Sequence, residues 1–390
     1  MIDYMAEAKR LEPQLIDIRR DFHRHPELGR RESRTAARIE DILRGAGIET
    51  RRAADTGVIG VLKCGKPGRT AAFRADIDAL PVTEATGLSY ASETDGLMHA
   101  CGHDIHTAAL LGAALILGRN REQLHGTMAF VFQPDEEGDG GAERILKSGV
   151  LQELGVESIY GAHTAPELPA GTIGVKYGRF YASAGKFDVT VCGQGTHGAE
   201  PENGTDSLYA AARMCTELKQ LTGDPADGDH RAVCTVGMFR AGEVRNIISD
   251  QAYFEGILRT AGPELREIKK TAIREIVRRI AEEERVEADL KLVDGYVGVT
   301  NHNAETRLVQ DTAESLLGPA HVTVEDRVLM TTEDFGFYLE KYPGAYYHIG
   351  VGSPYPLHSP KYCPDESGIA PAAAVHAAVL TKASISAPDL

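Results

Sequence analysis

The densest group of side chains that could bind a metal or move protons lies in MHACGHDIH, residues 98–106. Within six residues it contains Cys101, His103, Asp104 and His106. A cysteine and a histidine one residue apart can converge on one ion from a tight turn, and both are good ligands of first-row metals. The alternative is a capped helix start, with Asp104 as the N-cap and the histidines satisfied by hydrogen bonds. This segment alone does not decide between the two.

A second group, QPDEEG at residues 133–138, directly follows a predicted strand over 127–132. Sheets of α/β proteins place ligands at the carboxyl ends of parallel strands, where these three carboxylates would lie. Adjacent side chains point in different directions, so Glu136 and Glu137 can divide metal binding and proton transfer between them. The alternative is a solvated acidic turn.

Two more histidines follow later in the chain. His163 lies at the end of a short apolar strand, and His358 lies in the last fifth of the sequence. Taken alone, each would be interpreted as a structural or surface residue. Together with Cys101, His103 and one glutamate of the acidic pair, they form a plausible site for two metal ions.

Two other interpretations compete with the metal site. Cys101 could be a nucleophile with His103 or His99 as its base, which leaves the acidic pair and the distant histidines without a task. The protein could also bind metal without catalysis. Glu136 argues against that, because a carboxylate beside a metal ligand is the group needed to deprotonate a water molecule.

The elements that must position these residues alternate between helix and strand in the first half of the chain. The patterns predict helices over 11–25, 33–45, 104–117 and 142–148, and strands over 58–63, 70–77, 127–132, 159–164 and 172–177. Strands that are apolar throughout and separated by helices indicate an α/β fold whose sheet is buried on both faces.

The middle of the chain has a different order. Strands over 187–192, 232–239, 246–258 and 286–293, with helices over 206–221 and 263–284, give the order β-α-β-β-α-β. That order folds as a four-stranded sheet with two helices on one face. After residue 295 the pattern of the first half resumes. We therefore expect a catalytic domain over 1–182 and 295–390, interrupted by a smaller domain over 183–294.

Composition excludes several classes of function. The 390 residues carry a net charge of −15 and a pI near 5.4, which argues against a nucleic-acid partner. The longest apolar stretch, residues 108–117, is too short to cross about 30 Å of hydrocarbon. The N-terminal segment lacks the pattern of a secretory signal, and six scattered cysteines do not suggest a disulfide scaffold. We expect a soluble cytoplasmic protein with no membrane partner.

The chain resembles the metal-dependent N-acyl-amino-acid amidohydrolases. These form a branch of the dinuclear metallopeptidases that includes hippurate hydrolases, aminoacylases and indole-acetyl-amino-acid hydrolases. The resemblance extends from about residue 15 to 380. Its motifs are FHRHPELG (22–29), FRADIDALPV (73–82), MHACGHDIHTAALLGAA (98–114), FQPDEEGDGGA (132–142), TTEDFGFYL (331–339) and LHSPKY (357–362).

The resemblance implies a zinc-peptidase-like catalytic domain with an inserted ferredoxin-like α+β lid that dimerises. It implies two divalent metal ions, with Zn or Mn expected and Co or Ni also accepted. Glu136 would be the general base. The implied metal ligands are Cys101, His103, Glu137, His163 and His358.

Further roles follow from the same resemblance. Asp76 would support a metal-site histidine through a hydrogen bond. His197 of the lid would reach the active site of a partner subunit and stabilise the oxyanion. Asn246 and Arg259 would hold the substrate carbonyl and its free carboxylate.

The expected reaction is hydrolysis of the amide of an N-acyl L-amino acid, a small-molecule substrate, to a carboxylic acid and a free amino acid. The alternative with the same dinuclear site is a dipeptidase or carboxypeptidase. The sequence leaves open which acyl group and which amino acid are accepted, which metal is native, and whether the role is biosynthetic or catabolic. We expect a homodimer or a higher homo-oligomer formed through the lid.

Overall fold

The computed structural model describes residues 2–385 and divides into two compact units. The first unit extends to Gly178 and resumes over Thr300–Asp326 and from Phe337 onward. The second comprises Arg179–Val299 and Arg327–Gly336. The short 327–336 segment of the second unit is separated from the rest of it in sequence, and no local pattern had indicated that it belongs there.

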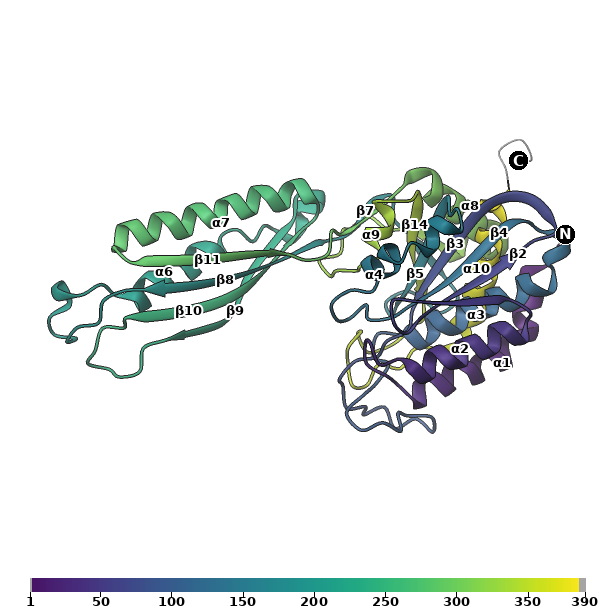
Figure 1. Cartoon of the computed structure of the whole chain (residues 1–390), viewed down its shortest axis with the longest axis horizontal. Helices are drawn as coiled ribbons and strands as arrows, with labels where there is room; N and C mark the ends of the chain where they lie inside the picture. Colours follow the sequence, from purple (N-terminus) through teal and green to yellow (C-terminus); the bar gives the residue numbers. More distant parts are fainter. Residues whose placement is uncertain (1, 386–390) are drawn as a thin grey trace. The chain divides into compact units, whose positions relative to one another are not determined.

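The first unit is built on an eight-stranded mixed sheet with the order β1-β2-β4-β3-β5-β14-β6-β13 (Figure 1). Its strands are β1 Glu49–Ala53, β2 Gly57–Lys63, β3 Lys66–Asp76, β4 His125–Gln133, β5 Ser158–Ala165, β6 Ile173–Val175, β13 Val322–Val324 and β14 Gly344–Gly350. Its helices are α1 Tyr4–Arg24, α2 Ser33–Gly45, α3 His103–Arg119, α4 Ala142–Lys147, α5 Val150–Glu153, α8 Asn303–Leu317 and α10 Ile369–Ala383. The short strands β7 Gly178–Tyr181 and β12 Val299–Asn301, and helix α9 Gly336–Leu339, lie where the chain passes between the units.

The central strands β4, β3, β5 and β14 run parallel to one another, so their carboxyl ends meet at one edge of the sheet. Strands β5 and β14 are buried along almost their whole length, as are the carboxyl-terminal halves of β3 and β4. This confirms the predicted sheet that is covered on both faces. The loops that follow these strands carry most of the predicted metal ligands.

Helix α3 is the central helix of the first core. Every residue from His103 to Leu117 is buried, so the helix is covered on all sides rather than on one face. It packs against α1 and α10 and against strand β3. At Gly112 a Cβ atom would come within 2.8 Å of Ala373 and of Leu15, so the absent side chain permits this close packing.

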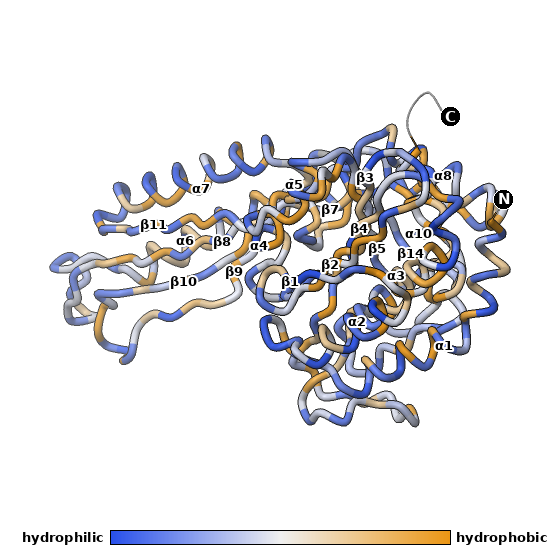
Figure 2. Tube along the Cα trace, turned by 45° about the vertical axis from the view of Figure 1, so that its right-hand side comes forward, coloured by the Kyte–Doolittle hydropathy of each residue, from blue (hydrophilic) through white to orange (hydrophobic). Residues whose placement is uncertain are grey.

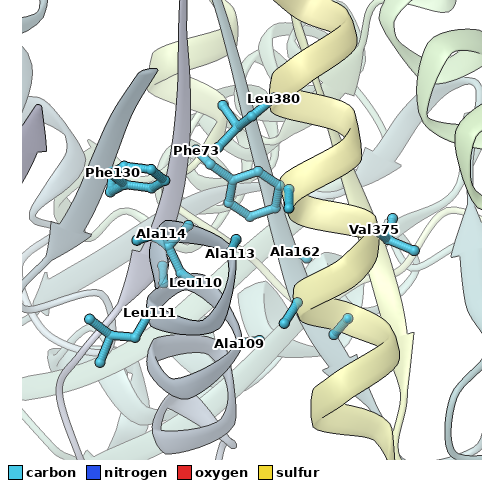
Figure 3. Close-up of a cluster of buried hydrophobic side chains, with 14 of the residues drawn as sticks. Phe73, Ala109, Leu110, Leu111, Ala113, Ala114, Phe130, Ala162, Val375 and Leu380 are labelled. Carbon is cyan, nitrogen blue, oxygen red and sulfur yellow. The ribbon is translucent and has the colours of Figure 1, made fainter. Parts of the chain in front are cut away.

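Figure 3 shows the side chains at the centre of this core. The ring of Phe73 on β3 lies between α3 and α10, where it contacts Tyr347 edge-to-face and His376 with a centroid separation of 4.2 Å. The surrounding side chains are small or aliphatic: Ala109, Leu110, Ala113, Ala114, Ala162, Val375 and Leu380. A rigid core directly beneath the strand ends fixes the position of the loops above it.

The second unit is a four-stranded antiparallel sheet with the order β11-β8-β10-β9. Its elements are β8 Ser183–Cys192, α6 Ser207–Lys219, β9 Ala232–Ala241, β10 Gln251–Thr260, α7 Pro263–Glu284 and β11 Glu287–Asp294. The predicted order β-α-β-β-α-β is confirmed. Both helices pack on the sheet face that carries Phe187, Val189 and Phe254. Hydrophilic residues alternate with hydrophobic ones along α7 in Figure 2, as expected for a helix with one buried side.

Two local differences from the sequence-based expectation bear on the site. The predicted strand over 246–258 begins only at Gln251, so Asn246 lies in the loop before it. Strand β1, which pairs with β2, was not predicted. Its sequence ETRRA carries little apolar signal, because β1 is an edge strand and is largely solvent-exposed. Among residues 2–385, no helix has both the length and the apolar character needed to cross a bilayer.

Candidate metal centre

The predicted ligands of the first unit converge at the carboxyl ends of its parallel strands. Glu136 and Glu137 follow β4, His163 lies near the end of β5, and His103 is the first residue of α3. Groups of their ligand atoms lie within 4.8 Å of one another: Cys101, His103 and His163; Cys101, Glu137 and His358; His103, Glu136 and Glu137. Three clusters that share members make one continuous site with room for more than one ion.

Cys101 lies at the centre of this set. Its Sγ atom is 3.4 Å from Nε2 of His163 and 3.3 Å from Nε2 of His358. His358 Nε2 is in turn 3.1 Å from Oε1 of Glu137. The segment with His358 is anchored by its backbone amide, which donates to the carbonyl of Ala100 at 2.8 Å.

The imidazoles are oriented by backbone acceptors. Nδ1 of His163 lies 2.8 Å from the carbonyl oxygen of Thr164, and Nδ1 of His103 lies 2.9 Å from that of Asp78. In both rings a donating Nδ1–H leaves Nε2 to face the cluster, which is the usual arrangement of a metal-binding histidine. Nε2 of His103 is buried and has no hydrogen-bond partner.

Glycine is required where the chain enters α3. Gly102 is the N-cap and has φ of 86°, in the left-handed region. A Cβ atom there would lie 2.5 Å from Oγ1 of Thr164, whose hydroxyl donates to the carbonyl of Cys101. Asp104 is therefore not the N-cap, and the interpretation of this segment as an ordinary capped helix start is wrong.

Asp76, at the end of β3, supports the cluster from beneath. Its Oδ1 atom accepts from Nδ1 of His106 at 2.5 Å, and its Oδ2 atom is 2.7 Å from Nη1 of Arg74. Oδ2 is also 3.7 Å from Nε2 of His103. The prediction was that Asp76 supports a metal-site histidine. The histidine to which it hydrogen-bonds is His106, whose Nε2 atom accepts from the amide of Thr164 at 2.8 Å.

Buried carboxylates dominate the electrostatics of the site. Burial lowers the pKa of His103, but neighbouring carboxylates, Asp76 above all, outweigh this and raise it to about 10. Burial likewise raises the pKa of Glu137, yet the hydrogen bond from His358 and the charge of His103 bring it below its usual value. The site therefore stabilises positive charge at its centre.

The same anionic surroundings act on the thiol. Burial, Glu137 and Glu136 together raise the pKa of Cys101 well above its usual range. A catalytic cysteine needs the opposite, a lowered pKa beside a cation. A divalent cation would remove this obstacle, because a coordinating thiol is deprotonated. The donor set of thiol, imidazole and carboxylate thus fits metal ions and disfavours the thiol-hydrolase alternative.

Glu136 differs from its neighbour Glu137 in its surroundings. Its side chain is buried, with 7% exposed, and one of its oxygens belongs to the group formed with His103 and Glu137. The backbone amide of Glu137 donates to Oδ2 of Asp78 at 3.0 Å, which holds this part of the turn in place. The two glutamates can therefore take different roles.

The predicted residues of the second unit form two groups. His197 and Asn246 are exposed and adjacent: the amide of Gly198 donates to the carbonyl of Asn246, and His197 forms an isolated bridge with Ile247. Arg259 lies near the opposite end of β10. It is half-buried, and its Nη1 atom has no hydrogen-bond partner.

Two residues of the first unit, Asp78 and His106, hold parts of the site in place, and the sequence analysis gave them no such role. Asp78 orients both His103 and the turn that contains Glu137, and His106 connects Asp76 to the end of β5. Asp78 could have been found from its position two residues after Asp76, and His106 from its place in the same short segment as Cys101 and His103.

The chain belongs to the peptidase family M20/M25/M40, which its residues 72–382 match. It is 38% identical over 361 residues to an N-acetyl-L-cysteine deacetylase of Bacillus subtilis, covering 92% of this chain and 85% of that protein. It is 33% identical over 387 residues, 97% of each chain, to thermostable carboxypeptidase 2 of Saccharolobus solfataricus.

A solved structure agrees with this assignment. A dinuclear metal-binding M20 peptidase of Bacillus subtilis superposes with a TM-score of 0.86 at 35% identity, covering 96% of this chain and 98% of that one. The family resemblance and the α/β, zinc-peptidase-like fold inferred from the motifs are therefore confirmed.

The first turn of α3 is held by a buried charged cluster. Asp104 is fully buried, 2.7 Å from Nε of Arg19 and 2.8 Å from Nδ1 of His23. Nε2 of His23 lies 3.3 Å from Glu84. Burial and Arg19 lower the pKa of His23, but the hydrogen bonds to the two carboxylates outweigh them and raise it. The protonated imidazole therefore stabilises this part of the fold.

We predict that His23→Gln lowers the free energy of unfolding at pH 6 by about 1.5–3 kcal/mol, the value of hydrogen bonds to charged groups. The contribution of a histidine with a raised pKa is complete below its unfolded pKa of about 6.5 and is lost as pH rises through the folded value. The loss should therefore shrink above pH 7. Urea unfolding with chelator present, from pH 5.5 to 8.5, measures this, with His321→Gln at an exposed position as the control. An unchanged pH profile in the variant would contradict the assignment.

Proposed function

We propose that this protein hydrolyses the amide bond of N-acyl L-amino acids, releasing a carboxylic acid and a free amino acid. The observation that carries the proposal is the set of overlapping groups of thiol, imidazole and carboxylate ligand atoms, one of which includes Glu136. Relatives named as N-acetylcysteine deacetylases, matched over more than nine tenths of this chain, support the substrate class. Other relatives are named as carboxypeptidases, so peptides are the second candidate class of substrate.

The proposed ligands of two divalent ions are Cys101, His103, Glu137, His163 and His358. The thiolate favours zinc, and manganese is the second choice, with cobalt or nickel also compatible with the donor set. When bound, the ions would polarise the scissile carbonyl and lower the pKa of the attacking water. Asp76, through His106, and Asp78, through His103, would keep the ligands in place.

Glu136 is the proposed general base. A carboxylate oxygen of Glu136 takes a proton from the attacking water and later delivers it to the leaving amine, so that the residue returns to its starting state. Its burial removes bulk water from around this carboxylate, which strengthens its interaction with the reacting groups.

The second unit is proposed to be a lid that binds substrate and forms a homodimer. Arg259, with an unpartnered Nη1 atom, would hold the substrate carboxylate, and Asn246 its carbonyl. His197 of the partner subunit would stabilise the oxyanion. Support for dimerisation comes from apolar side chains exposed on α6, on edge strand β9 and in the loop after it, which are Leu208, Tyr209, Phe239, Val244 and Ile247.

We propose the cytoplasm as the location of the protein. Six free thiols, all within the described residues, are compatible with that location.

The first test is the release of free amino acid from N-acetyl, benzoyl and fatty-acyl amino acids and from dipeptides. Each assay is run with and without EDTA, and with Zn or Mn restored. We expect chelator-sensitive release that metal restores, with acyl-amino acids cleaved faster than dipeptides. Faster cleavage of dipeptides would favour the carboxypeptidase alternative. Release that resists EDTA but is abolished by a thiol reagent would replace the proposal with catalysis by Cys101.

Glu136→Gln and Glu137→Gln form a matched pair of substitutions that separates the base from the ligand. Glu136→Gln should retain two bound ions and lose at least about 100-fold in kcat, the usual contribution of a general base. Glu137→Gln should lose metal. Metal content by mass spectrometry and turnover under saturating substrate give the result. Loss of metal in Glu136→Gln would reassign that residue as a ligand.

The shared-site hypothesis predicts complementation. His197→Ala and Glu136→Gln should each be nearly inactive alone. Mixed and re-associated as dimers, they should recover about a quarter of wild-type activity, because half of the dimers are mixed and each mixed dimer has one complete site. Subunit exchange is followed by native mass spectrometry. Exchange without recovery would mean that His197 does not act across the dimer.

A further inference from the structure

The residue before the two glutamates has an unusual backbone. Asp135 has φ of 59°, in the left-handed region, which aspartate and asparagine tolerate better than alanine or other L residues. Its amide donates to Oε1 of buried Glu32 at 2.9 Å, and its carbonyl accepts from the amide of Gly140 at 3.1 Å. The conformation is therefore held by one contact within the turn and by one from Glu32 outside it.

The side chain of Asp135, like its backbone, is held by specific contacts. It is 5% exposed, and its Oδ2 atom accepts from Nε of Arg30 at 3.0 Å and from Nη2 of Arg144 at 2.8 Å. A Cβ atom on Gly29 would lie 2.1 Å from Oδ1 of Asp135, and one on Gly138 would lie 2.2 Å from it. The carboxylate therefore packs directly against the backbone at Gly29 and Gly138, where any side chain would clash with it.

These contacts join the turn after β4 to the helix that follows it and to a loop more than 100 residues earlier in the chain. Arg30 comes from the loop between α1 and α2, Arg144 from α4, and Asp135 from the turn after β4. On the other side of Glu136, the amide of Glu137 is held by Asp78. The Glu136–Glu137 pair is therefore fixed at both ends, and Asp135 is the fixed point on the strand side.

We propose that Asp135 is a positioning residue of the metal centre, whose carboxylate, clamped by Arg30 and Arg144, sets the direction of Glu136 and Glu137. The inference rests on the proposed function, which assigns those two glutamates their roles. Asp135 itself touches neither metal nor substrate. It acts by keeping the turn in a conformation that the backbone alone disfavours.

The first experiment compares Asp135→Ala with Asp135→Asn in the full-length protein. Asp135→Ala should bind Zn or Mn about 10–100-fold more weakly, the range found when a supporting partner of a ligand is removed, and should lose kcat with little change in KM. Asp135→Asn should recover part of both losses. Asparagine tolerates the left-handed region and still offers an oxygen to the arginines.

A second pair of substitutions tests the mechanism. The three nearest atoms that a Cβ atom on Gly138 would meet are all side-chain atoms of Asp135. Gly138→Ala should therefore weaken metal binding in the wild-type background and have little further effect in Asp135→Ala. Arg144→Ala should resemble Asp135→Ala. Lys147→Ala, which breaks an exposed ion pair on the same helix, should match the wild type in metal affinity and turnover.

Metal affinity by competition with a chromophoric chelator is the deciding readout, with thermal unfolding measured in parallel. Variants that lose stability but bind metal and turn over like the wild type would overturn the positioning role. So would equal effects of Gly138→Ala in both backgrounds. If the wild type cleaves no acyl-amino acid and no dipeptide, the proposed function fails, and the metal affinities still decide the role of Asp135.

Discussion

The structure of the first unit depends on the burial of several acidic groups at one place. Asp76, Asp78 and Glu136 are buried beside the half-buried Glu137 and the thiol of Cys101. Charges removed from water are costly unless they are paired. Arg74 pairs with Asp76, and the carboxylates around His103, Asp76 above all, raise its pKa to about 10. The gathering of buried carboxylates with a thiol and imidazoles at one place is the physical basis of metal binding.

The fold keeps this arrangement in place from below and from the sides. Parallel strands bring their carboxyl ends together, and α3, covered on all sides, carries His103 on its first turn. The buried pair of Arg19 and Asp104 fixes that turn to α1. The Asp135 clamp does the same for the acidic turn. Each ligand segment is attached to a different element. The relative positions of the ligands are therefore kept only while the core of the whole unit is intact.

The second unit differs from the first in leaving its predicted functional residues largely outside a buried cluster. Its sheet has one face covered by α6 and α7, and it places His197 and Asn246 in exposed loops and Arg259 on a strand. Exposed polar groups beside exposed apolar side chains are poorly explained by the stability of the unit alone. They are explained if this surface meets a substrate and a second copy of the chain. The unpartnered Nη1 atom of Arg259 favours an anionic ligand for the same reason.

The sequence by itself determined the family, the reaction type and most of the elements, although edge strand β1 was not predicted from it. Ligand types within a few residues, such as Cys101 and His103, and hydrophobic periodicity, such as that of α7, are local properties that can be read directly. Which ligands meet is not a local property: the family resemblance implied that Cys101 and His358, 257 positions apart, share one site, but only the tertiary structure brings their side chains within 3.3 Å of each other. It also decided the roles of Asp78 and of Asp135 with its two arginines. These depend on where loops from separate elements cross, and that crossing is set by packing of the whole core rather than by any segment's own preference.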